Sequence, residues 1–176
     1  MKTPAKKIVQ IALILLICDS CTEPKKQINF GYDLDFLSQN TQTIVLKNNN
    51  DQCQIAIAPA FQGRVMTSTS KGRQGKSYGW INYDLIGSNT IQKHINAYGG
   101  EDRFWLGPEG GQYAIFFEKD TPFTLDYWNT PKVIDTEPFN LVDQSSTHAV
   151  FDQNITLENY QNFVFQINVN RKISLL

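Results

Sequence analysis

Alternation of apolar and polar residues with a period of two is the feature that most limits the fold of this chain. The longest alternating stretch is Phe163–Ile173, where apolar side chains occupy every second position from Phe165 to Val169. Side chains of a β-strand point alternately to opposite faces, so this stretch predicts a strand. Shorter stretches of this kind predict further strands at Thr43–Leu46, Gln54–Ala58, Gly63–Ser70, Ala114–Phe117, Thr124–Trp128 and Ala149–Leu157.

Turn signals separate these stretches, and helical signals are scarce. Asn48–Asp51 is a cluster of turn-forming residues, and Pro59 ends the stretch before it. Tyr32–Leu37 is the one segment predicted to form a short helix. Short strands with turns between them indicate an all-β fold, an antiparallel sandwich or barrel.

The charge balance narrows the range of partners. The 176 residues include 16 basic and 17 acidic side chains, for a formal net charge of -1, so no basic stripe for nucleic acid is expected. The sequence has none of the spacings of a phosphate-binding loop, a zinc protease or a serine hydrolase. Glu101, Asp102 and Glu109 are acidic but lack the spacing of a calcium-binding run. We therefore expect no metal and no cofactor.

Residues 1–21 are predicted to be an export signal. Basic residues come first, and Ile8–Ile17 is an apolar run of ten residues interrupted by Gln10. This run is too short to span a bilayer, which requires about 20 residues. Ser20 then precedes Cys21, and this ending resembles the signal of a bacterial lipoprotein. Cleavage would leave Cys21 as a lipidated N-terminus; the alternative is an ordinary signal peptide with a free Cys21.

Residues 22–30 are then a polar tether, and residues 31–176 form the folded part. With Cys21 lipidated, the protein would be exported and anchored in a bacterial membrane, on the periplasmic or outer-membrane face. Several acyl chains make such an anchor stable, since one chain alone holds weakly.

The segment Trp80–Glu109 has the composition of a carbohydrate site. Planar amides, carboxylates and a guanidinium make paired hydrogen bonds to neighbouring hydroxyls, aromatic faces stack on pyranose rings, and glycines let the backbone approach a ligand. The candidate sugar-binding residues of this segment are Asn82, Asn96, Asp102, Arg103, Trp105 and Glu109, and Arg64 is a further candidate outside it, at the start of the Gly63–Ser70 stretch. His94 and Glu101 are the candidate catalytic residues, because their side chains can transfer protons.

Each candidate also has a structural interpretation. His94 could be an ordinary loop histidine, Arg64 a surface cation, and Glu109 a solvated acid in a turn. Adjacent Glu101 and Asp102 point to opposite faces if the segment is extended, so at most one reaches a given ligand, and one could pair with Arg103 instead.

The aromatic candidates carry the same ambiguity. Trp80 and Trp105 are either stacking platforms or core residues, which is the commoner role of an aromatic side chain in a β-sandwich.

Several motifs resemble the galactose mutarotase-like superfamily. Ile55–Pro59 and Gln62–Val65 resemble its opening strands, and His94, Asn96 and the Gly99-Gly100 pair resemble its residues near the sugar. The resemblance also favours a sugar contact for Arg64, which comes at the start of the second of these strands. The stretches Ser77–Tyr83 and Glu101–Gly111 are more specific, and resemble a family of uncharacterised exported proteins of Bacteroidetes-type bacteria. Tyr98 departs from true aldose epimerases, which often have a histidine before the glycine pair.

This resemblance implies an antiparallel β-supersandwich and aldose 1-epimerase (isomerase) chemistry at the anomeric centre. It also implies that residues 31–176 are the N-terminal part of the domain, incomplete at the C-terminus. The catalytic glutamate of the superfamily would come later, so this chain is expected to be inactive on free sugars. The alternative is a non-catalytic, glycan-binding surface lipoprotein, which needs the aromatic and hydrogen-bonding residues but no paired acid and base.

Overall fold

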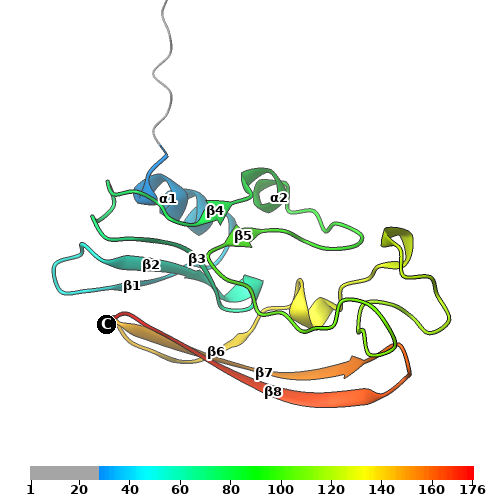
Figure 1. The fold of residues 1–176 in the computed structure, drawn as a ribbon. Helices are drawn as coiled ribbons and strands as arrows, with labels where there is room; N and C mark the ends of the chain where they lie inside the picture. Colours follow the sequence, from blue (N-terminus) through cyan, green and yellow to red (C-terminus); the bar gives the residue numbers. More distant parts are fainter. Residues whose placement is uncertain (1–27) are drawn as a thin grey trace, which may run out of the picture.

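A computed structural model describes residues 28–176 of the chain (Figure 1). The predicted signal, with Cys21, and most of the predicted tether lie outside the described residues. Within residues 28–176, none of the helices has the length and apolar character needed to cross a membrane.

The first sheet contains β1 (Ile44–Lys47), β2 (Gln54–Ala58) and β3 (Arg64–Thr69), in that order and antiparallel throughout. The short 3-10 helix η1 (Pro59–Phe61) links β2 to β3. After η1, Gln62 and Gly63 both adopt positive φ angles, and this sharp turn sends the chain back along β2.

The second large sheet contains β6 (Asn140–Gln144), β7 (His148–Glu158) and β8 (Val164–Ser174). β7 and β8 form a long antiparallel hairpin that pairs from His148 to Glu158 without interruption. Between these large sheets in sequence lies a two-stranded sheet of β4 (Trp80–Ile81) and β5 (Gly99–Gly100).

The remaining regular elements are helical and short. They are α1 (Phe30–Asn40), α2 (Tyr83–Ser88) and the 3-10 helices η2 (Leu125–Tyr127) and η3 (Lys132–Ile134). Asn29 caps the N-terminus of α1. Its side chain accepts a hydrogen bond from the Tyr32 N–H and thereby satisfies one of the free donors of the first turn.

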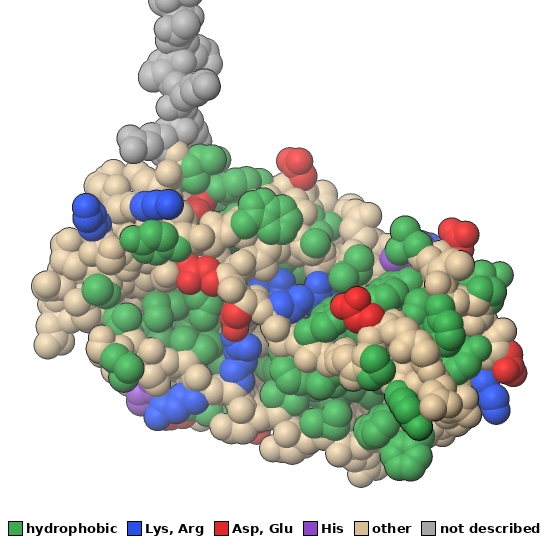
Figure 2. Space-filling model, viewed as in Figure 1, with side chains coloured by type: hydrophobic (Ala, Val, Ile, Leu, Met, Phe, Trp, Pro, Cys, Tyr) green, Lys and Arg blue, Asp and Glu red, His purple; other side chains and the backbone are tan. Residues whose placement is uncertain are grey.

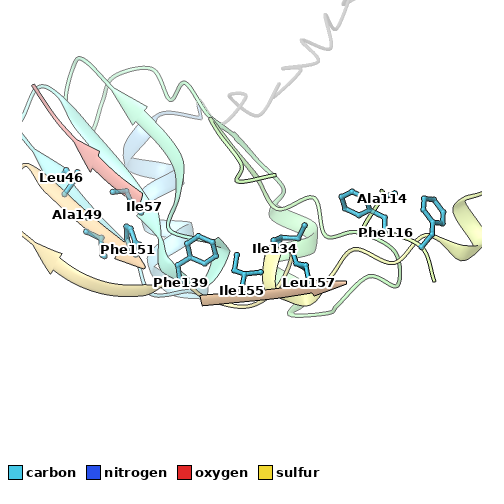
Figure 3. Packing of buried hydrophobic residues seen from close by; sticks show 12 residues of the cluster. Leu46, Ile57, Ala114, Phe116, Ile134, Phe139, Ala149, Phe151, Ile155 and Leu157 are labelled. Carbon is cyan, nitrogen blue, oxygen red and sulfur yellow. The ribbon is translucent and has the colours of Figure 1, made fainter. Parts of the chain in front are cut away.

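The β1–β2–β3 sheet lies between the helices on one side and the β6–β7–β8 sheet on the other (Figure 1). On β2, Ile57 packs in the core shared with the second large sheet, whereas Ala56 and Ala58 pack in the core shared with α1 and α2. In Figure 3, Leu46 and Ile57 lie beside Ala149 and Phe151 at one end of the core between the two large sheets.

The prediction of a mostly β, antiparallel fold is confirmed, and the predicted strands at Thr43–Leu46, Gln54–Ala58, Gly63–Ser70, Ala149–Leu157 and Phe163–Ile173 correspond to β1, β2, β3, β7 and β8. The predicted helix at Tyr32–Leu37 lies inside the longer α1.

Three expectations of secondary structure were wrong. Ala114–Phe117 and Thr124–Trp128 form no strands, and the second of these contains η2. Ala114, Phe116 and Phe117 are nevertheless buried in the core, and Trp128 packs against it, from irregular backbone. The α2 helix was not expected, since six residues are too few to show a helical period.

Substitution of Gly63 would test how closely the two large sheets pack. It has φ +60, and a Cβ added there would lie 2.7 Å from ring atoms of Phe151 on β7. Gly63→Ala should therefore lower the free energy of unfolding by about 2 kcal/mol or more, because the new methyl group is both strained and crowded. Urea unfolding measures this change. Gly110→Ala is the matched control, since nothing lies within 4 Å of its added Cβ; a loss no larger than that of the control would contradict the packing.

Candidate functional site

An open depression of about 280 Å³ lies where β4 and β5 meet the start of β3. Its lining comes from three segments that are far apart in the sequence, and consists of Arg64, Trp80, Ala97, Gly99, Gly100, Glu101, Asp102 and Arg103. Figure 2 shows basic side chains near the middle of the face in view, with acidic side chains next to them. Four of the predicted site residues, Arg64, Glu101, Asp102 and Arg103, are thus brought together.

The aromatic side chain of the depression is Trp80, which is 61% exposed on β4. Its position is set by contacts on both sides of it in the chain. Ser77 and Tyr83 both donate hydrogen bonds to the buried carboxylate of Asp33 on α1. Burial, followed by this carboxylate, raises the pKa of the Tyr83 phenol. These two hydrogen bonds fix the chain before and after Trp80. The backbone of Trp80 therefore has little freedom, and its indole is held at the surface.

The backbone before Trp80 also passes close to β3. The Gly79 N–H donates to Thr67 Oγ1 at 3.1 Å. A Cβ added at Gly79 would lie 2.0 Å from the carbonyl oxygen of Met66, so a glycine is required for this approach.

Gly99 and Gly100 form β5, and both have positive φ angles. A Cβ at Gly99 would lie 2.2 Å from the Trp80 carbonyl oxygen, and a Cβ at Gly100 would lie 2.6 Å from Cδ of Arg64. The glycine pair therefore lets the side chain of Arg64 pass beneath β5 while the backbone above it faces the depression.

Arg64 is only 2% exposed, which is unusual for a charged side chain. Its Nη1 donates to the Gly99 carbonyl at 2.8 Å and its Nη2 donates to Gln62 Oε1 at 2.9 Å. Burial, followed by the nearby Arg103, lowers the pKa of Arg64 to about 10, so the guanidinium remains a cation at neutral pH. Within the described residues, its Nε–H is buried without an acceptor.

The neighbouring acids Glu101 and Asp102 have different roles. Asp102 Oδ1 accepts from the Val65 N–H at 2.9 Å, and Oδ2 forms an ion pair with Arg171 of β8. Asp102 thus ties the depression to both large sheets. The Glu101 N–H donates to the Val65 carbonyl at 2.8 Å, whereas its carboxylate is exposed and forms no ion pair or hydrogen bond with the residues that the structure describes.

Asp135 holds a buried network behind the depression. Its carboxylate accepts from the backbone N–H of Asn96 and, at 2.7 Å, from the Asn96 side chain. It also pairs with Arg103 at 2.8 Å. Asn96 is 1% exposed and lines no part of the depression, so the structure places it in the interior.

Trp105 and Glu109 also lie outside the depression. The Trp105 indole donates to Glu109 Oε1 at 2.9 Å, and its ring stacks on Phe116, with the centroids 4.9 Å apart. The Arg103 guanidinium lies 4.3 Å from the centre of the Trp105 ring on this stack. Arg103 thus contacts the depression on one side and the aromatic core on the other.

His94 and Asn82 occupy structural positions. His94 Nδ1 lies 2.7 Å from the Trp128 carbonyl, and His94 is not among the residues that line the depression. Asn82 caps α2 by accepting from the Leu85 N–H at 3.1 Å, and donates to the Ala97 carbonyl at 2.9 Å. Asn82 therefore positions the loop that carries Ala97.

Sequence reasoning missed the partners that hold the site residues in place. Gln62, Asp135 and Arg171 make the contacts of Arg64, Arg103 and Asp102 described above. Asp135 and Arg171 lie 32 and 69 residues from their partners, so no local spacing pointed to them, whereas Gln62 is only two residues from Arg64. Across residues 28–176, no three His, Cys, Asp or Glu side chains gather into a group that could hold a metal ion.

Substitution of Asp135 would measure how much its hydrogen bonds and ion pair contribute to the free energy of unfolding. Asp135→Ala removes the carboxylate of a largely buried ion pair and leaves Arg103 and the Asn96 amide without their acceptor. We expect the free energy of unfolding to fall by about 3–5 kcal/mol, because an uncompensated buried charge remains. Asp35→Ala is the matched control, since Asp35 forms an exposed ion pair with Arg73 and should contribute at most about 1 kcal/mol. Equal losses in the two variants, measured by urea unfolding, would contradict this assignment.

Comparison with known proteins identifies a family for the whole of the described chain. Neither the curated proteins nor the solved structures gave a match to this chain. A family model does match, over residues 28–176, which include every strand and helix described above and the whole depression. The chain therefore belongs to the family of unknown function DUF6786.

Proposed function

We propose that the depression beside β4 and β5 binds a carbohydrate. The observation that carries this proposal is the exposed indole of Trp80 at the edge of a hollow whose other lining is charged side chains and glycine backbone. The flat apolar face of an indole stacks on the C–H face of a pyranose. Carboxylate and guanidinium groups beside it hydrogen-bond to the hydroxyls of the same ring.

The polar contacts would come from Glu101, Arg64 and the backbone of β5. The carboxylate of Glu101 is exposed and forms no hydrogen bond or ion pair with any described residue, so it can accept hydrogen bonds from two hydroxyls. Gly99 and Gly100 carry no side chains that would keep a ligand away from the backbone. Asp102 is already bonded through both carboxylate oxygens, which makes it a support for the site.

The geometry favours binding without catalysis. An epimerase needs an acid and a base on opposite sides of the ring oxygen and the anomeric hydroxyl. Glu101 lines the depression, but His94 does not, and Nδ1 of His94 is close to a backbone carbonyl. In the described chain, Asp102 and Arg103 are both ion-paired and therefore poor proton carriers.

We further propose that the protein is a surface lipoprotein, exported and anchored through Cys21, that holds glycans near the membrane. For the fold, the packing of the β1–β2–β3 sheet on the β6–β7–β8 sheet supports our assignment to a mutarotase-like supersandwich. The aldose 1-epimerase activity implied by that resemblance is the alternative function.

Trp80→Ala should weaken glycan binding by about 5- to 30-fold, because the loss of a stacking platform costs about 1–2 kcal/mol. The indole is largely exposed, so the melting temperature should change little. Binding to a glycan array, followed by titration calorimetry with the best ligand, measures the effect. Tyr113→Ala is the matched control, since Tyr113 is also 61% exposed but does not line the depression. Unchanged affinity in the Trp80 variant would refute the proposed platform.

Proton NMR of anomer exchange distinguishes binding from catalysis. With D-galactose and D-glucose, we expect exchange at the uncatalysed rate in the presence of the protein, because no acid–base pair from residues 28–176 faces the depression. Acceleration that disappears in His94→Ala would instead establish the epimerase and reject the non-catalytic proposal.

A further inference from the structure

Arg64 stands apart from the two other arginines near the depression. Arg103 pairs with Asp135, and Arg171 pairs with Asp102. Arg64 is the most buried of the three, yet its two hydrogen-bond acceptors, the Gly99 carbonyl and the Gln62 side chain, are neutral. Within residues 28–176, the most deeply buried cation of the site thus has no carboxylate partner.

The hydrogen-bonding capacity of Arg64 is also incompletely used. A guanidinium has five N–H donors, and two of them are occupied by Gly99 and Gln62. The Nε–H is buried and has no acceptor in the described chain. A buried donor without an acceptor and a buried charge without a counter-ion both cost free energy. A ligand that supplies an anionic acceptor would remove both costs.

The charges around this side chain do not balance its own. Arg103 is paired with Asp135 and Arg171 with Asp102, whereas none of the described carboxylates pairs with Arg64. Among the described residues, Glu101 brings an unpaired negative charge to the depression, but at its exposed rim. The unpaired charge in the interior of the depression is therefore a cation, and the unpaired charge at its rim is an acid.

We propose that the sugar bound in the depression carries an anionic group, a carboxylate or a phosphate, and that this group binds beside Arg64. This inference rests on the proposed carbohydrate function. Gly99 and Gly100 admit the group over the guanidinium, and Trp80 stacks on the ring. Glu101 at the rim hydrogen-bonds to hydroxyls but repels the anion, so its charge opposes the selectivity that Arg64 creates.

Titration calorimetry of the full chain tests the proposal with matched sugars. D-Galacturonate and D-glucuronate represent the carboxylate source, D-galactose 6-phosphate and D-glucose 6-phosphate the phosphate source, and D-galactose and D-glucose the neutral reference. We expect one anionic class to bind about tenfold or more tightly than the neutral sugars, as for a hydrogen bond to a charged group. The class that gains identifies the source, and added salt should reduce the gain.

Two variants assign this preference to the site. Arg64→Gln should abolish it, so that anionic and neutral sugars bind with equal affinity, and Glu101→Gln should strengthen it, because the repelling charge is gone. Arg73→Gln removes a cation that is exposed and paired with Asp35, away from the depression, and should change nothing. If Arg64→Gln does not fold, the exposed Glu101 variant decides, since a preference that it leaves unchanged overturns the proposal.

The remaining outcomes separate this inference from the proposed function. Neutral sugars that bind as well as anionic ones overturn the inference and leave carbohydrate binding intact. A preference that survives in Arg64→Gln also overturns it, because another cation then selects the anion. Binding of no sugar of either class overturns both proposals.

Discussion

Burial of the β1–β2–β3 sheet on both faces is the constraint on which the rest of the structure depends. Ile57 of β2 enters the core shared with β7, while Ala56 and Ala58 enter the core shared with α1. A slip of one residue would exchange the two faces and place small residues where large ones are needed. The register of these strands therefore fixes where β3 begins, and Arg64 is the first residue of β3.

The depression lies at the start of β3, where Arg64 is the first residue of the strand. Arg64 is carried beneath β5 by that register, and only a glycine at position 100 leaves room for its side chain. Asp102 then joins Val65 to Arg171 of β8, so the rim of the depression is connected to the second large sheet. The depression is therefore bordered by a cation that is itself almost fully buried.

Local patterns predicted most of the strands but little of the site. Alternation identified β8 because every second residue there packs against a core, and it identified β2 because successive residues there enter the two different cores. It failed for β6, whose five residues are all exposed, and it was misleading at Ala114–Phe117, where Phe116 stacks between two tryptophans without a strand. In the site, Arg64 and Arg103 line one depression, but Asn96 is in the interior with Asp135, which is 39 residues away in the chain.

The sequence by itself determined the mostly β character, the positions of the long strands and the segment that carries the depression, because period and turn chemistry are local properties. Only the tertiary structure decided which side chains of that segment face solvent. Trp80 and Trp105 are chemically identical, yet one is exposed on β4 and the other stacks on Phe116. Long-range contacts make that choice, since each side chain goes where distant strands and helices leave it either space or a partner.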